Sequence, residues 1–198
     1  MSVLKGITLL FVAVSLASCG GGDIAENEFV KQLPDDQKKA VVKRMNLMCD
    51  CASKTEVLSK FDLSAKDQLK KAEVLVAAVE SGDTVEIKAA KTAYDKSRET
   101  LDAVEDSEEF NKLNECLENI GKSLTEEESK AASTGDSKIR SLMSEQFTDD
   151  EEGFQKAREN FMSFCPKMAK ADKSQKIQFK AQGKVDSVED KLKEMKIE

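Results

Sequence analysis

Five cysteines are the residues of this chain with the most distinctive chemistry: Cys19, Cys49, Cys51, Cys116 and Cys165. Thiols form disulfides, bind metal ions as thiolates, act in redox exchange, or stay reduced and pack as small apolar groups. Metal and redox sites are usually built on C-x-x-C motifs, whereas Cys49 and Cys51 form a C-x-C motif with no second close pair. Two structural disulfides among the four cysteines after Cys19 are therefore favoured, and the other three uses remain open.

Helix geometry around Cys49 and Cys51 narrows the disulfide pairing. Side chains at this spacing point about 200° apart on an α-helix, so a bridge between them would distort the helix. Cys49 and Cys51 can instead each form a disulfide with a cysteine on a different helix. We favour Cys49 with Cys165 and Cys51 with Cys116, although four cysteines allow three pairings and the sequence alone does not choose.

The chain contains no histidine. This absence excludes Ser-His and Cys-His nucleophiles and removes the commonest metal ligand. The acidic run 148–153 lacks the twelve-residue ligand pattern of a calcium-binding EF-hand, so it is interpreted as an acidic first helical turn. No enzymatic activity, cofactor or metal site is therefore expected. The net charge of −7 also argues against nucleic acid as a partner.

Two stretches have both a structural and a binding interpretation. Phe154, Phe161 and Phe164 recur at helical spacing, which is typical of core packing but would also suit a pocket for a lipid or peptide. Residues 167–184 hold six lysines and one acid, which is typical of a solvated connector but would also suit anionic lipid headgroups. Core packing and a solvated connector are the favoured interpretations.

Helices must position these residues, because the composition is rich in Ala, Lys, Glu and Leu and no strand-like alternation persists. Capping boxes are expected at Ser64–Asp67 and Thr148–Glu151, and Gly121 is expected to end a helix. The sequence predicts an all-α, up-and-down bundle of about four main helices plus a short C-terminal helix. The predicted helices span 35–60, 65–80, 84–120 with a kink near 106, and 149–170 with a bend or early end at Pro166, and a loop spans 121–137.

The N-terminus has the features of a secretory signal peptide. Residues 7–16 are almost wholly apolar and follow a single cation, Lys5. Ten helical residues span about 15 Å, half of the roughly 30 Å hydrocarbon core of a bilayer, so the run is too short for a transmembrane anchor. Small residues precede Cys19, and three glycines follow it as a flexible tether.

Leu16, Ala17, Ser18 and Cys19 resemble the lipobox of bacterial lipoproteins, in which Leu and two small residues precede a cysteine. The resemblance implies that the Cys19 thiol carries diacylglycerol, that the chain is cut before Cys19, and that the new amino group is acylated, with chains of the palmitate type. In this family an Asp after the cysteine retains the protein in the inner membrane, so Gly20 implies the outer membrane. Whether the domain faces the periplasm or the cell surface stays open.

These observations predict a lipid-anchored cell-envelope protein with a non-catalytic binding or structural role. Its expected partners are the membrane, through Cys19, and an envelope protein, with no nucleic acid and no small-molecule ligand assigned. The alternative is an envelope thiol, redox or metal-binding protein that uses Cys49, Cys51, Cys116 and Cys165. Beyond the lipobox, the chain resembles small helical cysteine-containing lipoproteins without an assigned activity. The expected organisation is a cleaved signal peptide at 1–18, a lipidated tether at 19–33, a helical bundle domain at 34–171 and a charged tail with a short helix at 172–198.

Overall fold

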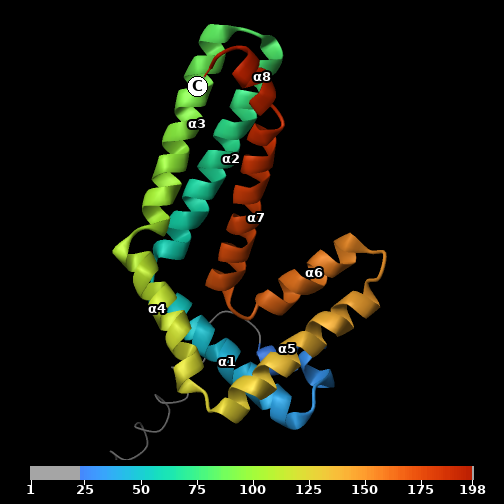
Figure 1. Cartoon of the computed structure of the whole chain (residues 1–198). Helices are drawn as coiled ribbons and strands as arrows, with labels where there is room; N and C mark the ends of the chain where they lie inside the picture. The colour runs from blue at the N-terminus through green and yellow to red at the C-terminus, as the bar shows by residue number, and fades with distance from the viewer. Residues whose placement is uncertain (1–22, 198) are drawn as a thin grey trace, which may run out of the picture. The chain divides into compact units, whose positions relative to one another are not determined.

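The computed structural model describes residues 23–197, and over this range the chain consists of α-helices and two short 3-10 helices, with no strand (Figure 1). This confirms the predicted all-α class. The expectations for Leu16–Cys19 lie outside the described residues. Eight α-helices occupy the described range, so the predicted number is too low. The elements are η1 (Ile24–Glu26), η2 (Val30–Gln32), α1 (Asp35–Ser53), α2 (Val57–Ser81), α3 (Thr84–Glu105), α4 (Glu108–Ser123), α5 (Glu126–Gln146), α6 (Glu151–Met162), α7 (Pro166–Asp186) and α8 (Glu189–Glu194).

The chain folds into two compact units, and each unit is made from two separate segments of the sequence. The first unit consists of the described residues up to Leu47 together with Ser123–Pro166. The second unit consists of Met48–Lys122 together with the residues from Lys167 onward. The expected boundary between the helical domain and the tail, at residue 171, falls inside α7, which continues to Asp186.

Helices α2 and α3 of the second unit form an antiparallel hairpin, because the residues between them end one helix and begin the next. Gly82 adopts the left-handed conformation, with a φ of 76°, and its N–H donates to the Ala78 carbonyl. Asp83 then accepts hydrogen bonds from the N–H groups of Val85 and Glu86, which caps α3. The predicted break at residues 81–83 is therefore confirmed.

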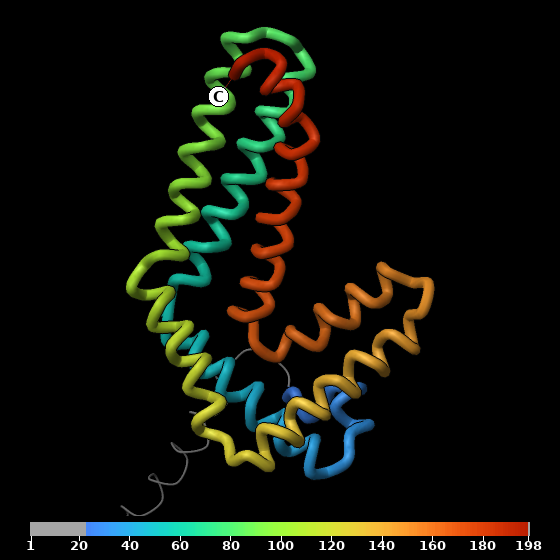
Figure 2. The backbone as a smooth tube through the Cα atoms, viewed as in Figure 1, coloured from blue at the N-terminus to red at the C-terminus, as the bar shows by residue number. Residues whose placement is uncertain are grey.

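Helix α7 runs parallel to α2 and completes the core of the second unit (Figure 2). Ser174, near the start of α7, donates to Asp62 near the start of α2 at 2.9 Å, and Lys184 near its end lies 3.7 Å from Glu73. The segment expected as a charged tail thus supplies core residues as well as charge. One buried cluster consists of Ala72, Leu75, Ala78, Val79, Ile87, Ala90, Tyr94, Ala181, Val188, Leu192 and Ile197, and a second consists of Phe61, Ala65 and Leu101.

The predicted helix 35–60 is interrupted by a turn, which a carboxylate from α4 stabilises. Glu109 accepts hydrogen bonds from Thr55 Oγ1 at 2.8 Å, from the Glu56 N–H at 3.0 Å and from Lys60 Nζ at 2.5 Å. These bonds, with that from Lys60 the largest cause, lower the pKa of Glu109 from 4.5 to about 2. The start of helix α2 is therefore stabilised by a carboxylate from α4, a helix that comes much later in the sequence.

Both predicted capping boxes are wrong. Ser64 lies inside α2, since that helix begins seven residues earlier at Val57. Asp150, rather than Thr148, caps α6 by accepting a hydrogen bond from the Gly153 N–H at 2.8 Å. The predicted helix 149–170 ends early at Met162, and Pro166 is the first residue of α7, where its fixed φ and missing N–H are tolerated.

The predicted loop 121–137 is wrong, because most of it belongs to α5. Thr125 and Glu128 form the capping box of this helix, with Thr125 Oγ1 accepting from the Glu128 N–H and Glu128 accepting from the Thr125 N–H. The Glu128 carboxylate also binds Lys43 Nζ of α1 at 2.7 Å. Gly121 does not end a helix in the left-handed conformation but lies within α4.

Gly135 allows α5 to pack closely against α1 in the first unit. A Cβ atom at this position would lie 2.7 Å from Val41 Cγ2 and 3.3 Å from Leu33 Cδ1. The first distance is shorter than a van der Waals contact between carbon atoms, which is about 3.5 Å. The glycine interpreted as a loop residue is therefore a site of close approach between two helices.

We expect Gly135→Ala to destabilise the protein by about 1 kcal/mol, because crowding against Val41 costs about 1–3 kcal/mol and improved helix propensity recovers about 1 kcal/mol. Gly121→Ala is the matched control, since a Cβ atom at Gly121 meets nothing within 4 Å. It should stabilise the protein by about 0.5–1 kcal/mol. Urea unfolding followed by circular dichroism compares the two variants, and equal stabilisation by both would contradict the close packing.

Candidate functional site

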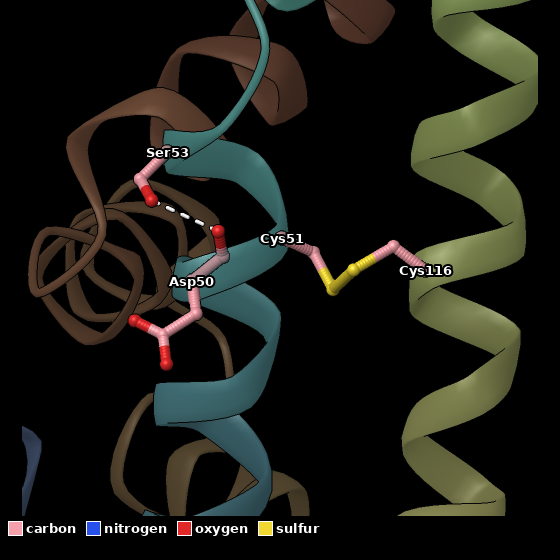
Figure 3. Close-up of a disulfide and its surroundings, with 4 residues drawn as sticks. All are labelled: Asp50, Cys51, Ser53 and Cys116. Carbon is pink, nitrogen blue, oxygen red and sulfur yellow. Dashed lines mark hydrogen bonds between the residues drawn. A yellow bond between two sulfur atoms is a disulfide. The ribbon is translucent and has the colours of Figure 1, made fainter.

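Cys51 and Cys116 form a disulfide in the second unit, joining the last turns of α1 to α4 (Figure 3). The sulfur atoms are 2.01 Å apart and the Cα atoms 5.8 Å apart. This is the pairing that helix geometry favours for these two residues. Cys49 and Cys165 are also disulfide-bonded, and their favoured pairing with each other stays a prediction. All four cysteines are thus oxidised, which leaves no thiolate at these positions for metal binding.

A cavity of about 460 Å³ lies within the first unit, among α1, α5 and α6. We call it the arginine-rimmed cavity, because Arg140 and Arg158 line it. Four of its lining residues are buried: Met45, Ile139, Met143 and Phe161. This volume and this apolar lining are typical of pockets that hold small molecules. The complete lining comprises Met45 of α1, Asp136, Ile139, Arg140 and Met143 of α5, and Phe154, Arg158, Phe161 and Met162 of α6.

The lining residues share one face of each helix. On α5, Asp136, Ile139, Arg140 and Met143 follow the i, i+3, i+4, i+7 spacing that places side chains on the same face. On α6 the lining positions 154, 158, 161 and 162 have the spacing i, i+4, i+7, i+8, which also keeps side chains on one face. The α6 stripe is therefore apolar apart from Arg158, whereas the α5 stripe holds Asp136 and Arg140 beside its two apolar residues.

The phenylalanines of α6 and of the turn after it divide between two roles. Phe154 and Phe161 line the arginine-rimmed cavity, while Phe164 lies outside its lining. The rings of Phe161 and Phe164 contact each other edge to face, with centroids 6.4 Å apart. Phe161 and Phe164 are also buried, so the core-packing interpretation and the pocket interpretation both describe part of this stripe.

Arginine is concentrated in the helices that line the cavity. Of 31 lysines and arginines, only four are arginines, and Arg44, Arg140 and Arg158 all belong to the three helices that form this cavity. Arg140 and Arg158 line it and are exposed at the rim. Sequence reasoning missed these arginines. The available signal was that each arginine recurs at the helical spacing of the apolar residues around it.

Asp136 is the one acidic residue in this lining among the described residues, and Arg44 balances its charge. The Arg44 guanidinium forms an ion pair with the Asp136 carboxylate. Burial lowers the pKa of Arg44, and the nearby charge of Arg140 lowers it further, so the two guanidinium groups are close enough to repel each other. Arg140 and Arg158 are the two cationic residues of this lining.

The lysines of residues 167–184 mostly pair with acids inside the second unit. Lys167 Nζ contacts Glu56 at 2.8 Å and also donates to the Thr55 carbonyl at 2.7 Å. Lys170 lies 3.2 Å from Asp62, and Lys176 lies 3.4 Å from Asp172. These pairs favour a structural role for the segment over contact with lipid headgroups.

A second hollow, of about 580 Å³, lies among α3, α7 and α8 of the second unit. Its charged residues largely neutralise one another. Lys91 binds Asp95 at 2.8 Å, and Lys193 binds Glu189 at 2.9 Å. What distinguishes the arginine-rimmed cavity is therefore its methionine and phenylalanine lining rather than the balance of its charges.

Within residues 23–197, no group of three or more histidine, cysteine, aspartate or glutamate side chains is placed to hold a metal ion. None of the helices in the same range has the length and apolarity needed to cross a bilayer. Comparison with known proteins found no matching family model, no matching curated protein and no matching solved structure.

Proposed function

We propose that this chain is a lipid-anchored protein of a bacterial cell envelope, with a binding role rather than a catalytic one. The observation that carries the proposal is the lipobox-like sequence from Leu16 to Cys19 at the end of a short apolar run. Lipidation at Cys19 would hold an acidic, helical domain at a membrane surface. Gly20 after the cysteine supports the outer membrane, with the domain facing either the periplasm or the outside.

The oxidised cysteines of the domain support this location. Disulfides persist in exported proteins and are rare where thiols are kept reduced. In the Cys51–Cys116 bridge, Cys51 is only 6% exposed and Cys116 is half-buried, which suits a structural bond. The same bond argues against the alternative of a thiol, redox or metal-binding protein, because that function needs these sulfur atoms as thiolates.

The arginine-rimmed cavity supports binding over a purely structural role. Its walls are apolar and its rim carries guanidinium groups, and such a mixture orients a small molecule within a pocket. The chain also lacks histidine, which lowers the prospects for acid–base or nucleophilic catalysis at this site. A role in holding a ligand at the envelope is thus the function with the most support.

Cys19→Ser tests the anchor. We expect the unaltered protein to sediment with membranes and to carry acyl mass on its mature N-terminus, while the Cys19→Ser form loses that mass and is released to the soluble fraction. The measurement is membrane fractionation followed by intact mass spectrometry. Replacing Cys51 and Cys116 together is the control, because it removes two cysteines and leaves the lipidation position intact. Equal sedimentation of the Cys19→Ser form, with no acyl mass on the unaltered protein, would overturn the proposal.

A further inference from the structure

We propose that one face of the α2–α3 hairpin is the docking surface for a second copy of this chain, bound about a two-fold axis so that Lys71 of each copy meets Glu86 of the other. The surface is a groove of about 550 Å³ within the second unit, here called the hairpin groove. Self-association goes beyond the proposed binding role, and it requires neither the lipid on Cys19 nor the arginine-rimmed cavity.

The hairpin groove is lined by α2 and α3 alone. Its lining comprises Lys71, Val74, Ala77 and Ala78 of α2 and Glu86, Ala89, Ala90 and Ala93 of α3. On α3 these positions have the spacing i, i+3, i+4, i+7, and on α2 the positions 71, 74 and 78 have the spacing i, i+3, i+7, so each helix presents one face. Helix α7 packs against buried residues of the same two helices but contributes nothing to this lining. The groove is therefore a face of the hairpin that no other described helix covers.

This face exposes apolar side chains to solvent. Val74 is 50% exposed, and Ala77 and Ala89 of the same groove are exposed as well. Val85, which precedes Glu86 at the tip of the hairpin, is 76% exposed. Alanine side chains are short, so a second helix can approach the groove closely and remove this apolar surface from water. Burial of the groove is thus the favourable term that a partner would supply.

Lys71 and Glu86 are the two charged residues of the lining, and they lie at its opposite ends. The helices are antiparallel around the turn at Gly82, so Glu86 lies close to the tip while Lys71 lies about three helical turns from it. The two residues are therefore separated by about 12 Å along the hairpin. Within residues 23–197 neither forms an ion pair, and Glu86 accepts a long hydrogen bond from Ser81 Oγ at 3.4 Å. Each residue thus presents a charge that a partner can balance.

A groove with a cation at one end and an anion at the other is complementary to its own copy. When a second hairpin lies on the first and runs in the opposite direction, each Lys71 meets the Glu86 of the other copy and the apolar centres face each other. Self-complementary contacts of this kind define dimers with two-fold symmetry. The net charge of −7 makes two copies repel, but salt at about 0.15 M screens this repulsion beyond about 8 Å. The pattern favours a second copy over a helix of another protein, which would need the same two charges at the same separation.

Charge reversal tests the pairing in the purified full-length protein. Sedimentation equilibrium should show that the unaltered protein exists as monomers and dimers in reversible equilibrium. Lys71→Glu and Glu86→Lys should each raise the Kd of the dimer by about tenfold or more, because each places like charges together at both contacts. An equimolar mixture of the two variants should recover a Kd within about threefold of that of the unaltered protein, since the mixed dimer has opposite charges at both contacts.

Lys70→Glu and Glu80→Lys are the matched controls. Both residues are exposed on α2, lie outside the lining and undergo the same changes of charge. Each control should leave the Kd within about threefold of its original value, and the thermal unfolding midpoint of each variant shows that the fold is intact. A protein that stays monomeric up to about 500 µM would overturn the proposal. Charge-reversed variants that dimerise as the unaltered protein does, or a mixture that does not recover, would overturn it as well.

Zero-length crosslinking identifies the contact. A carbodiimide joins a lysine amine to a carboxylate when the two groups touch, so an equal mixture of isotope-labelled and unlabelled protein should yield Lys71–Glu86 peptides with one labelled and one unlabelled half. Links confined to peptides of a single label would place both residues in one copy and contradict the two-fold contact. The same reagent applied to whole membranes tests the occupant. Lys71 or Glu86 linked to a different protein, with no link between copies, would refute the assignment of a second copy.

Discussion

Replacing both Cys51 and Cys116 with alanine is expected to lower the free energy of unfolding by about 4 kcal/mol. The two residues are 65 positions apart in the sequence, and closing so long a loop removes much of the conformational entropy of the unfolded chain. Small domains are stable by only about 5–15 kcal/mol, so the change would be a large part of the total. Urea unfolding at pH 7 measures it. A loss below about 1 kcal/mol would show that the bond does little for stability.

Peptide mapping of the non-reduced protein is the companion measurement. It should recover Cys51 linked to Cys116, and we expect Cys49 linked to Cys165. The doubly substituted variant should keep the second link, so that the stability change reports one bond. Four free thiols with bound zinc in the unaltered protein would instead support the thiol or metal-binding alternative.

Replacing Asp62 with alanine is the other change with a large expected effect, a destabilisation of about 3 kcal/mol. The Asp62 side chain is only 4% exposed and accepts hydrogen bonds from Ser174 and Lys66 at 2.9 Å, with Lys170 at 3.2 Å. Its loss leaves the buried Ser174 hydroxyl without this acceptor and breaks two ion pairs. Because Ser174 and Lys170 belong to α7, the substitution loosens α7 from α2. Urea unfolding at pH 7 provides the measurement.

The acid dependence of Asp62 gives a second, independent readout. Burial raises the pKa of Asp62, but hydrogen bonds from Lys66, Ser174 and Lys170 outweigh it, so the pKa lies below its ordinary value of 3.8. A carboxyl whose pKa is lowered by folding stabilises the protein above its unfolded pKa and loses this contribution as the pH falls through its folded pKa. The stability difference between Asp62→Asn and the unaltered protein should therefore shrink below pH 4. Asp67→Asn, an exposed position on the same helix, should show no such change.

The sequence predicts the helical class and the strongest breaks well, because those depend on local chemistry. Gly82 and Asp83 end α2 and begin α3 through their own backbone and side chain, so the break at 81–83 could be placed from neighbouring residues alone. The turn at 54–56 could not, because its cap is Glu109 on another helix. Where the signal for a helix end comes from a residue about fifty positions away, local patterns do not contain it.

Gly135 explains the largest error in the predicted fold. Glycine is a poor helix former, and together with the polar residues around it this position favours a loop on propensity alone. In the structure Val41 lies so close that any larger residue would crowd it. Packing against α1 therefore overrides the local preference. A sequence pattern cannot distinguish a glycine that frees the backbone from one that admits a neighbouring helix.

The candidate site was predicted only in part, for a related reason. The spacing of Phe154 and Phe161 indicates an apolar face, and a pocket was one of its interpretations. The arginines drew no prediction, because a charged residue near an apolar stripe is usually exposed on the opposite face. Arg140 and Arg158 become informative only when α5 and α6 bring both to one cavity. The pairing of Cys51 with Cys116 was easier to predict than the cavity, since helix geometry limits how Cys51 can reach another helix.

Each unit combines segments that lie far apart in the sequence, and this arrangement has a consequence for biosynthesis. Ala181, Leu192 and Ile197 complete the apolar core around α2 and α3, yet a ribosome adds them only after α4, α5 and α6 have been made. The hairpin of α2 and α3 therefore waits for all the residues from Asp106 to Cys165 before α7 can cover it. Apolar surface that stays uncovered during synthesis is the kind that misassembles or aggregates.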